Sequence, residues 1–445
     1  MLLDALRRKD AKCIVLALKE GDFMAPFADL TKHLIYCPSD LRTIKWSFMR
    51  DIIDISSFSL ISNIFFPPDP KSTGPWLNGA RLIFEKLLVY AYVKGIKSTA
   101  TVFEDIFINP RGASAWHEYL LETPGGGAAA GLLAQPDSLT AYGFYLTVIV
   151  GIQPLEIMAK NDGEFSIREY MKDPHAGSLF IITREDFSAM LAPAQQLFLE
   201  ILMICHLSMS QDIDRRIFYF LDELPNLPFR IQKLGKLCAV ARQLGSSIII
   251  GAQSYLQIDS VYGEAERRSI CNNLNVKALM CIADSATAKE SSDTIGTAEF
   301  ECTRQTVSTN INDHGANSNM TEKKEITVIT PSELTNMKKF ETWLHVPGYG
   351  VAGTKTKYTK YPQKNAPIVS DPEYDLSKLD EKYAEIEAKR KKYIASIAVE
   401  EAKLVEDISV IHNSAQLEKT FEKSDELRWQ QTITLINTDE NMGMY

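Results

Sequence analysis

The sequence IFYFLDELPNL, residues 217–227, places two adjacent acids, Asp222 and Glu223, directly after a run of apolar residues, and a proline follows two positions after Glu223. A continuous apolar run is typical of a parallel strand that is buried on both faces of its sheet. In open α/β sheets, ligands bind beyond the carboxyl ends of the strands. The stretch therefore predicts two carboxylates at the ligand-binding edge of a parallel sheet.

Two neighbouring carboxylates at such an edge suit nucleotide hydrolysis. In nucleotide hydrolases the first acid typically holds magnesium through water and the second orients the attacking water, because metal and nucleophile are neighbours at the γ-phosphate. Asp222 and Glu223 are the candidates for these two roles. The alternative is a strand end capped by solvated acids, and a single motif of this kind leaves both readings open.

The next apolar run adds a second polar strand end. SSIIIGAQS, residues 246–254, ends in Gln253 and Ser254, where a glutamine could sense the γ-phosphate and where the alternative is a polar turn cap. Between the two runs, Arg242 lies near the end of an expected helix. It is either a surface base or a positive charge offered to the nucleotide of a neighbouring subunit.

Composition limits the class of protein. A chain of 445 residues exceeds the roughly 250 to 300 residues at which a single core stops growing, so two lobes, or one lobe with appendages, are expected. The content of 45% hydrophobic and 24% charged residues is that of a globular protein. We expect neither a membrane span nor a signal peptide. The seven cysteines form no CxxC pair or metal-binding spacing and indicate reduced core thiols in a cytoplasmic protein.

The net charge of −9 is concentrated at one end of the chain. Residues 371–445 carry 17 acids against 10 bases, a net charge of −7, which leaves −2 for the other 370 residues. The main body is therefore nearly neutral, so its local basic patches remain compatible with a phosphate backbone.

Strands and helices alternate in the first and third parts of the chain, which predicts a parallel α/β sheet. The intervening part is mainly helical, and its stretch 124–131, PGGGAAAG, reads as a flexible linker. Residues 304–325 are polar and are expected to be mobile, and apolar residues recur near a heptad rhythm from Leu376 onward, which indicates one long charged helix. The expected strands are CIVLAL, HLIYC, SLFIITR, RRIFYFLDE, SSIIIGAQS and VKALMCIAD, and the expected helices include residues 193–210, 230–243 and 263–272.

Residues 215–296 resemble the second half of the motor domain of type IV coupling proteins, especially the F-type, TraD-like branch. These are RecA-like hexameric ATPases of conjugation and type IV secretion. The resemblance rests on the combination of DELPNL, ARQLG, GAQS and QIDSVYGE. It extends to CIVLALKEGDF, GPWLNGARLIFEKLL and SLFIITREDFSAMLAPAQQLFLEILM upstream, and to EITVITPSEL and ETWLHVPGYG downstream.

The resemblance implies residue roles and cofactors. Asp222 would organise Mg²⁺, Glu223 would polarise the attacking water and Gln253 would sense the nucleotide, which is ATP. Arg242 would be the finger that reaches across the ring to a neighbouring subunit. Candidate contacts to DNA are basic residues for which the alternative is a solvated helix face. They are Lys233, Lys236, Arg267 and Arg268.

The resemblance also implies an assembly. Six copies would form a ring at the cytoplasmic face of the bacterial inner membrane, and single-stranded DNA with its attached relaxase would thread the pore towards the secretion channel. The acidic tail would dock an accessory protein of the relaxosome, with a simple coiled-coil stalk as the alternative. The domains expected are a first part of the RecA-like motor (1–84), an inserted all-α domain (85–170), a second motor part with Walker B (171–366) and an acidic helical tail (367–445).

Two departures from the family pattern matter. The sequence contains no GxxxxGK followed by Ser or Thr, the loop that wraps a triphosphate, and it lacks the family's N-terminal membrane helices. Ala17 and Leu18 stand where relatives often have an aspartate after the first strand. Two hypotheses follow: a DNA-pumping motor whose phosphate-binding loop and membrane anchor are encoded upstream, or an adaptor that recruits relaxosome or effector proteins without hydrolysing ATP.

Overall fold

The computed structural model describes residues 1–18, 22–68, 75–110, 112–184, 187–308, 316–372, 384 and 387–392. The chain divides into two compact units, Met1–Val369 and Ser370–Tyr445. Residues 387–392 of the second unit are helical. The rest of the long tail helix expected from the heptad rhythm lies outside the described residues.

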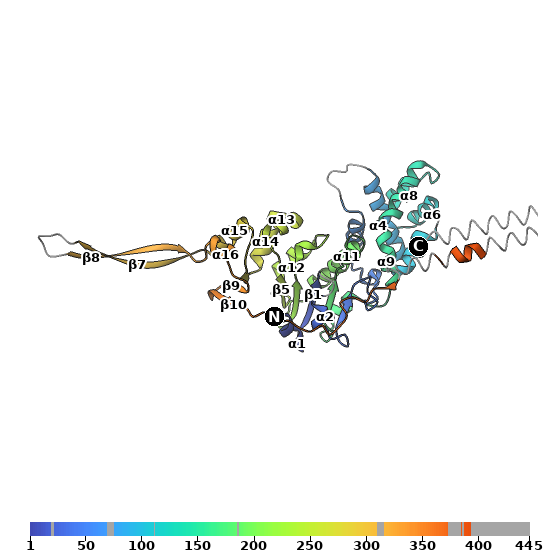
Figure 1. Cartoon of the computed structure of the whole chain (residues 1–445). Coiled ribbons are helices and arrows are strands. Elements are labelled where there is room, and N and C mark those ends of the chain that lie inside the picture. The colour runs from blue at the N-terminus through green and yellow to red at the C-terminus, as the bar shows by residue number, and fades with distance from the viewer. Residues whose placement is uncertain are drawn as a thin grey trace, which may run out of the picture. The chain divides into compact units, whose positions relative to one another are not determined.

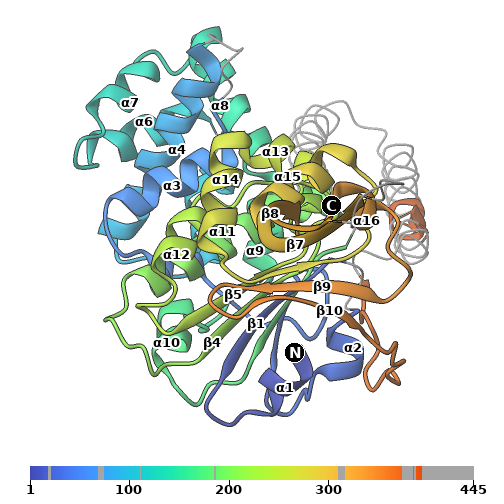
Figure 2. The same cartoon turned by 90° about the vertical axis from the view of Figure 1, so that its left-hand side faces the viewer.

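The core of the first unit is a five-stranded parallel sheet with the strand order β2-β3-β1-β4-β5. Figure 2 labels β1, β4 and β5 of this sheet. Strands β1 and β3 are buried along their whole length, as their continuous apolar runs require. Leu221 of β4 pairs with Leu16 on one side and with Ile250 on the other, so the three strands end along one edge. The predicted parallel α/β class is confirmed. The strands are β1 Lys12–Ala17, β2 Leu34–Tyr36, β3 Leu179–Ile182, β4 Ile217–Leu221 and β5 Ser246–Ile250.

Helices cover both faces of this sheet. On one face, Phe198 of α11 stacks on Tyr36 of β2 with ring centroids 3.8 Å apart. On the other face, Ala5 of α1 packs with Val15 and Phe220, which alternate along their strands with residues of the first face. The helices are α1 Leu2–Arg7, α2 Met24–Phe27 and α11 Ser188–Leu207.

Helix α11 is long and apolar enough to cross a membrane by length and composition, and the bent pair α8 and α9 would be a second candidate among the described residues. In α11, 61% of the apolar stretch that passes this test is buried within the unit. Glu200 and His206 of this helix are buried as well. Its position against the sheet accounts for its apolar character.

Residues 75–172 are helical and contain no strand in the part that the structure describes (Figure 1). Their core is aromatic, with the Phe107 ring centroid 5.4 Å from that of Phe84 and 5.8 Å from that of Trp116. Helix α4 crosses residue 85, and the predicted boundaries at 85 and 170 stay predictions. The elements are α3 Ser56–Phe65, which precedes this region, α4 Pro75–Val93, α5 Thr99–Thr101, the π-helix η2 Val102–Ile108, α6 Ala113–Leu121, α7 Gly127–Leu132, α8 Leu139–Gly151, α9 Gln153–Lys160 and α10 Ile167–Lys172.

The glycine-rich stretch 124–131 is not the flexible linker that its composition predicted. It enters helix α7, whose Ala129 and Ala130 are buried. A Cβ atom on Gly126 would lie 2.1 Å from the carbonyl oxygen of Leu120, so this glycine permits a close approach of two backbones. The small residues of this stretch therefore allow close packing of the backbone.

The remainder of the first unit departs from strict alternation of parallel strands and helices. The expected strand VKALMCIAD forms β6, which pairs antiparallel with β9 in a separate three-stranded sheet in the order β10-β9-β6. Most of 304–325, predicted to be mobile, belongs to the antiparallel ribbon of β7 and β8, which Figure 1 shows extending away from α15 and α16. The elements are η1 Phe48–Asp51, η3 Leu224–Asn226, α12 Leu234–Val240, α13 Tyr255–Tyr262, α14 Glu264–Asn273, β6 Lys277–Leu279, α15 Ser285–Ile295, β7 Thr297–Ser308, β8 Ala316–Thr327, α16 Pro331–Thr335, β9 Glu341–Val346 and β10 Gly350–Lys355.

We expect Gly126→Ala to lower the free energy of unfolding by about 1 to 3 kcal/mol, because the added methyl group would overlap a backbone oxygen that cannot move alone. Gly127→Ala is the matched control, since a Cβ at Gly127 meets no atom within 4 Å and alanine favours the helix. Urea denaturation of both variants measures the difference. Equal stabilities of the two variants would contradict the packing role of Gly126.

Candidate functional site

Asp222 and Glu223 follow β4 at the carboxyl edge of the parallel sheet, where the sequence places them. The turn that carries them is tied to the end of β5, because Gly251 donates its N–H to the carbonyl oxygen of Leu221 at 3.0 Å and accepts from Leu224 at 3.1 Å. Glu223 adopts a left-handed conformation with φ of 47°, which is uncommon for a residue with a side chain. The Asn226 amide donates to the Glu223 carboxylate at 3.1 Å.

Gly251 sets the distance between the two strand ends. A Cβ atom at this position would lie 2.2 Å from Oδ1 of Asp222 and 3.3 Å from the Glu223 nitrogen. Any other residue at this position would displace the Asp222 carboxylate. The glycine of GAQS is therefore part of the geometry that positions the first acid.

Gln253 is exposed at the same edge, two residues beyond Gly251. Ser254 instead caps helix α13, since its Oγ accepts from the Gln257 N–H at 3.3 Å. Arg242 is exposed and lies four residues before β5, at the amino edge of the sheet. The structure thus brings Asp222 and Gln253 to one edge and holds Arg242 at the other, roughly 16 Å away along a five-residue strand.

A metal at this edge would depend on Asp222. No group of three or more His, Cys, Asp or Glu side chains that could hold a metal ion exists among the residues described. Mg²⁺ ordinarily keeps several waters and takes one or two carboxylates together with substrate phosphates. One exposed carboxylate beside a nucleotide suits that mode of binding.

Glu200 of α11 holds the segment that follows the two acids. Its carboxylate accepts hydrogen bonds from the backbone N–H of Gln232 and, at 3.2 Å, from that of Lys233, where α12 begins. Burial raises the pKa of Glu200 to about 7, against the lowering effect of these donors. Sequence reasoning missed this residue, since a single acid in an apolar helix reads only as an interruption of a possible membrane span.

The four basic residues predicted to contact DNA fall into two groups. Lys233 and Lys236 lie at the start of α12, where Lys233 is partly exposed and Lys236 is exposed. Arg268 is exposed and forms an ion pair with Glu264 at 2.6 Å. The prediction is wrong for Arg267, whose side chain is 2% exposed and donates to Asp259 and Glu290, both at 2.7 Å. A guanidinium enclosed by two carboxylates is unavailable to a phosphate.

Two further polar groups near the carboxyl edge were also missed. Gln195 of α11 donates to the carbonyl oxygen of Ile182 at 2.8 Å, at the end of β3. The side-chain oxygen Oε1 of Gln195 and the hydroxyl of Thr183 are buried without a hydrogen-bond partner in the described part of the chain. Nothing in the sequence around these residues signals that position.

Comparison with known proteins gives consistent matches. Residues 1–352 match the family described as the type IV secretion-system coupling protein DNA-binding domain. The coupling protein TraD of Escherichia coli K12 is 26% identical over 278 residues, which are 61% of this chain and 38% of that protein. The match therefore spans less than half the length of this relative.

Solved structures of the conjugative coupling protein TrwB share the fold. An unbound form lacking its N-terminal segment has a TM-score of 0.65 at 22% identity, covering 81% of both chains. A complex of TrwB with ADP and Mg²⁺ has a TM-score of 0.64 at 21% identity, covering 81% of this chain and 82% of that one. At this identity the likeness establishes the fold.

The raised pKa of Glu200 predicts that the free energy of unfolding depends on pH. The pKa is about 7 in the folded chain against the ordinary 4.5, so the unfolded chain loses this proton first and stability falls as pH rises between these values. We expect the stability of the wild type relative to Glu200→Gln to drop by about 3 kcal/mol between pH 4.5 and pH 8. Urea denaturation across this range measures the drop.

The matched control for this pH series is Glu264→Gln, which removes an exposed glutamate from α14. Its stability is expected to follow that of the wild type across the range. A wild type and a Glu200→Gln variant with parallel pH profiles would show that Glu200 is not held neutral in the folded chain.

Proposed function

The chain belongs to the type IV secretion-system coupling proteins of the TraD and TrwB type, and from this membership we propose that it is a motor subunit that pumps single-stranded DNA to the secretion channel during conjugation. ATP hydrolysis supplies the energy, and the relaxase travels with the DNA. The proposal goes beyond the family membership in naming the cargo, the direction of transport and the source of energy.

The arrangement of Asp222, Glu223 and Gln253 at one sheet edge is the observation that carries this proposal. Asp222 would hold Mg²⁺ through water, and the neighbouring Glu223 would orient the attacking water. Gln253, on the adjacent strand end, would respond to the γ-phosphate. TrwB, which shares the fold, has been solved with ADP and Mg²⁺ and with a non-hydrolysable ATP analogue, which supports the same cofactors here.

The position of Arg242 supports hydrolysis between subunits. Five residues of β5 separate it from the edge that carries Asp222, which favours a role at the nucleotide of a neighbouring chain over one at its own. A ring of six copies would bring the Arg242 of one protomer to the carboxyl edge of the next. A finger supplied in this way stabilises charge in the transition state.

The phosphate-binding loop is the component that these 445 residues do not contain, since GxxxxGK followed by Ser or Thr occurs nowhere in them. Strand β5 ends the parallel sheet and has one hydrogen-bonded neighbour among the described residues. A further strand bearing that loop would pair with its free edge. It would then place the phosphates beside Asp222 and Gln253.

The same absence favours a second function, that of an adaptor. In this case the chain would recruit the relaxase, accessory proteins of the relaxosome or effector proteins to the secretion channel at the cytoplasmic face of the inner membrane. The acidic segment 371–445 would serve as a docking site in either case. The DNA upstream of codon 1 separates the two, because an adjacent frame encoding apolar spans and GxxxxGK[ST] favours the motor.

We expect the purified chain of 445 residues to hydrolyse ATP with Mg²⁺ at background rate, because most phosphate contacts come from the missing loop. Phosphate release with and without single-stranded DNA measures this. Glu223→Gln is the matched control, since it removes the water-polarising carboxylate with a small change in shape. Turnover well above background that Glu223→Gln abolishes would show that the chain carries a complete site.

A further inference from the structure

We infer that a basic cavity of about 420 Å³ between α10, α11 and the loop that precedes β4 binds a backbone phosphate and the attached nucleotide of single-stranded DNA. This assignment rests on the proposed function, which supplies the polyanion. It differs from every DNA contact that the sequence predicted.

Three cations converge on this cavity. Arg168 and Lys172 of α10 and Arg215, two residues before β4, line it together with Ser208 and Ser210. The Ser208 hydroxyl donates to the carbonyl oxygen of Cys205 at 2.8 Å. No carboxylate is among its lining residues in the described part of the chain. Cations and hydroxyl groups are the donors that proteins direct at phosphate oxygens.

Both arginines are fixed in place before any ligand arrives. Arg168 donates from Nη2 to the carbonyl oxygen of Ile52 at 2.8 Å, and Arg215 donates from Nη1 to the carbonyl oxygens of Ser210 at 3.1 Å and Leu244 at 3.2 Å. A guanidinium has five N–H donors, so donors remain for a ligand. Because these side chains are already ordered, binding costs less conformational entropy.

Three acids close in sequence to the cavity residues make hydrogen bonds of their own. Asp51 accepts from the Trp46 indole, the Ser166 hydroxyl and two backbone N–H groups at the start of α10. Asp54 accepts from Ser56 and Ser57. Asp212 accepts from the N–H of Arg215 and lies 3.6 Å from its guanidinium, so it partly offsets the charge of Arg215.

Lys172 is the free cation of the group. It is exposed, and within the described residues it makes no hydrogen bond or ion pair. Cys205 at the same cavity adds no opposing charge, since burial raises the pKa of its thiol to about 12. The charged side chains that line the cavity are therefore all cations.

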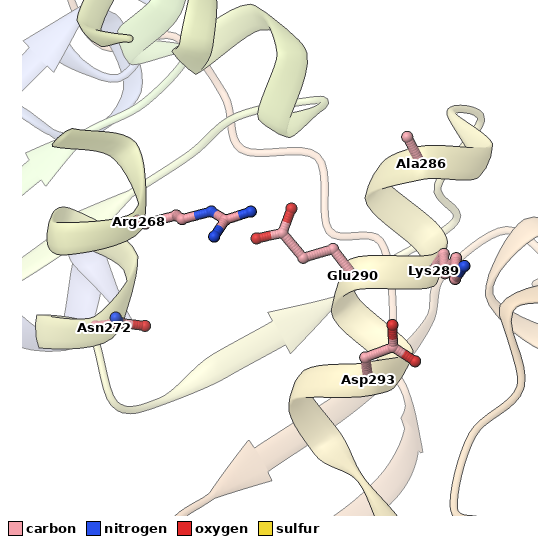
Figure 3. Close-up of a pocket in the computed structure, with 6 residues that line it drawn as sticks. All are labelled: Arg268, Asn272, Ala286, Lys289, Glu290 and Asp293. Atoms are coloured by element: carbon pink, nitrogen blue, oxygen red, sulfur yellow. The ribbon is translucent and has the colours of Figure 1, made fainter. Parts of the chain in front are cut away.

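A second cavity provides the contrast. It has a volume of about 540 Å³ and lies between α14 and α15, where Arg268 and Lys289 are accompanied by Glu290 and Asp293. Figure 3 shows the Arg268 guanidinium and the Glu290 carboxylate pointing toward one another. Mixed charge of this kind gives no preference for an anion. The cavity at Lys172 differs from this one because its charged lining residues are all cations.

The size and walls of the Lys172 cavity suit a nucleotide unit. A volume of about 420 Å³ falls in the range of small-molecule sites. Met171 and Met209 supply apolar wall against which a base can pack without hydrogen-bond selection. Contacts that ignore base identity suit a protein that must accept any sequence.

The test measures binding of a fluorescein-labelled oligo(dT) of 20 nucleotides to the full chain by anisotropy. Lys172→Glu is expected to weaken binding about tenfold at 0.1 M salt and to reduce the salt slope by about 1. Arg168→Gln, which keeps a donor for Ile52, is expected to weaken it less. Lys97→Glu is the matched control, because it reverses an exposed lysine that lies outside the cavity and is not a predicted DNA contact. It is expected to have a much smaller effect.

Each outcome decides between the proposals. Wild-type binding that Lys172→Glu and Arg168→Gln leave unchanged overturns the cavity and leaves the proposed function standing. Absence of oligo(dT) binding by the wild type overturns DNA binding by this chain, and the cavity assignment with it. Stabilisation by inorganic phosphate that requires Lys172, without an effect of Lys172 on oligo(dT), would assign the cavity to a free anion and overturn the DNA assignment.

Discussion

The contact between the ends of β4 and β5 is the constraint on which the candidate site depends. Parallel pairing of Leu221 with Ile250 aligns the two strand ends, and the missing side chain at Gly251 lets the Asp222 carboxylate lie against the next strand. The left-handed backbone at Glu223 is held by hydrogen bonds of the same turn. An uncommon conformation persists only where its surroundings determine it, and such positions cluster at functional sites.

Helix α11 connects this edge to the rest of the unit. Its apolar residues fill the space above the sheet, while a few buried polar groups tie down the loops that surround the site. Glu200 binds the start of α12, and Gln195 binds the end of β3. At the other end, His206 lies 2.7 Å from the Tyr219 hydroxyl, and burial lowers its pKa to about 4, which keeps it neutral. Each of these three buried polar side chains thus makes at least one hydrogen bond to a neighbouring element.

The sequence was sufficient for the sheet and for the two acids, because a buried parallel strand has a strong apolar signal and ends at a charged pair. It failed where one chain segment meets another distant in sequence. Arg267 reads as a surface base until Asp259 and Glu290 enclose it. Strands β7 and β8 pair only with one another among the described residues, and their polar sequences show no alternation of apolar and polar residues. Lys172 and Arg215 are 43 residues apart in the sequence and meet only in the fold.

Acidic and basic side chains that flank β4 lie at opposite edges of the parallel sheet, and this division would let a nearly neutral body bind both a metal nucleotide and a polyanion. Asp222 and Glu223 follow β4 at the carboxyl edge, whereas Arg215 precedes the same strand at the amino edge. A strand of five residues separates the two sites by roughly 16 Å, which exceeds the screening length of about 8 Å at physiological ionic strength. The acids that would hold Mg²⁺ therefore repel little of the DNA that the basic cavity would bind. Because both sites flank one rigid strand, a change at the nucleotide edge that shifts β4 would also move Arg215.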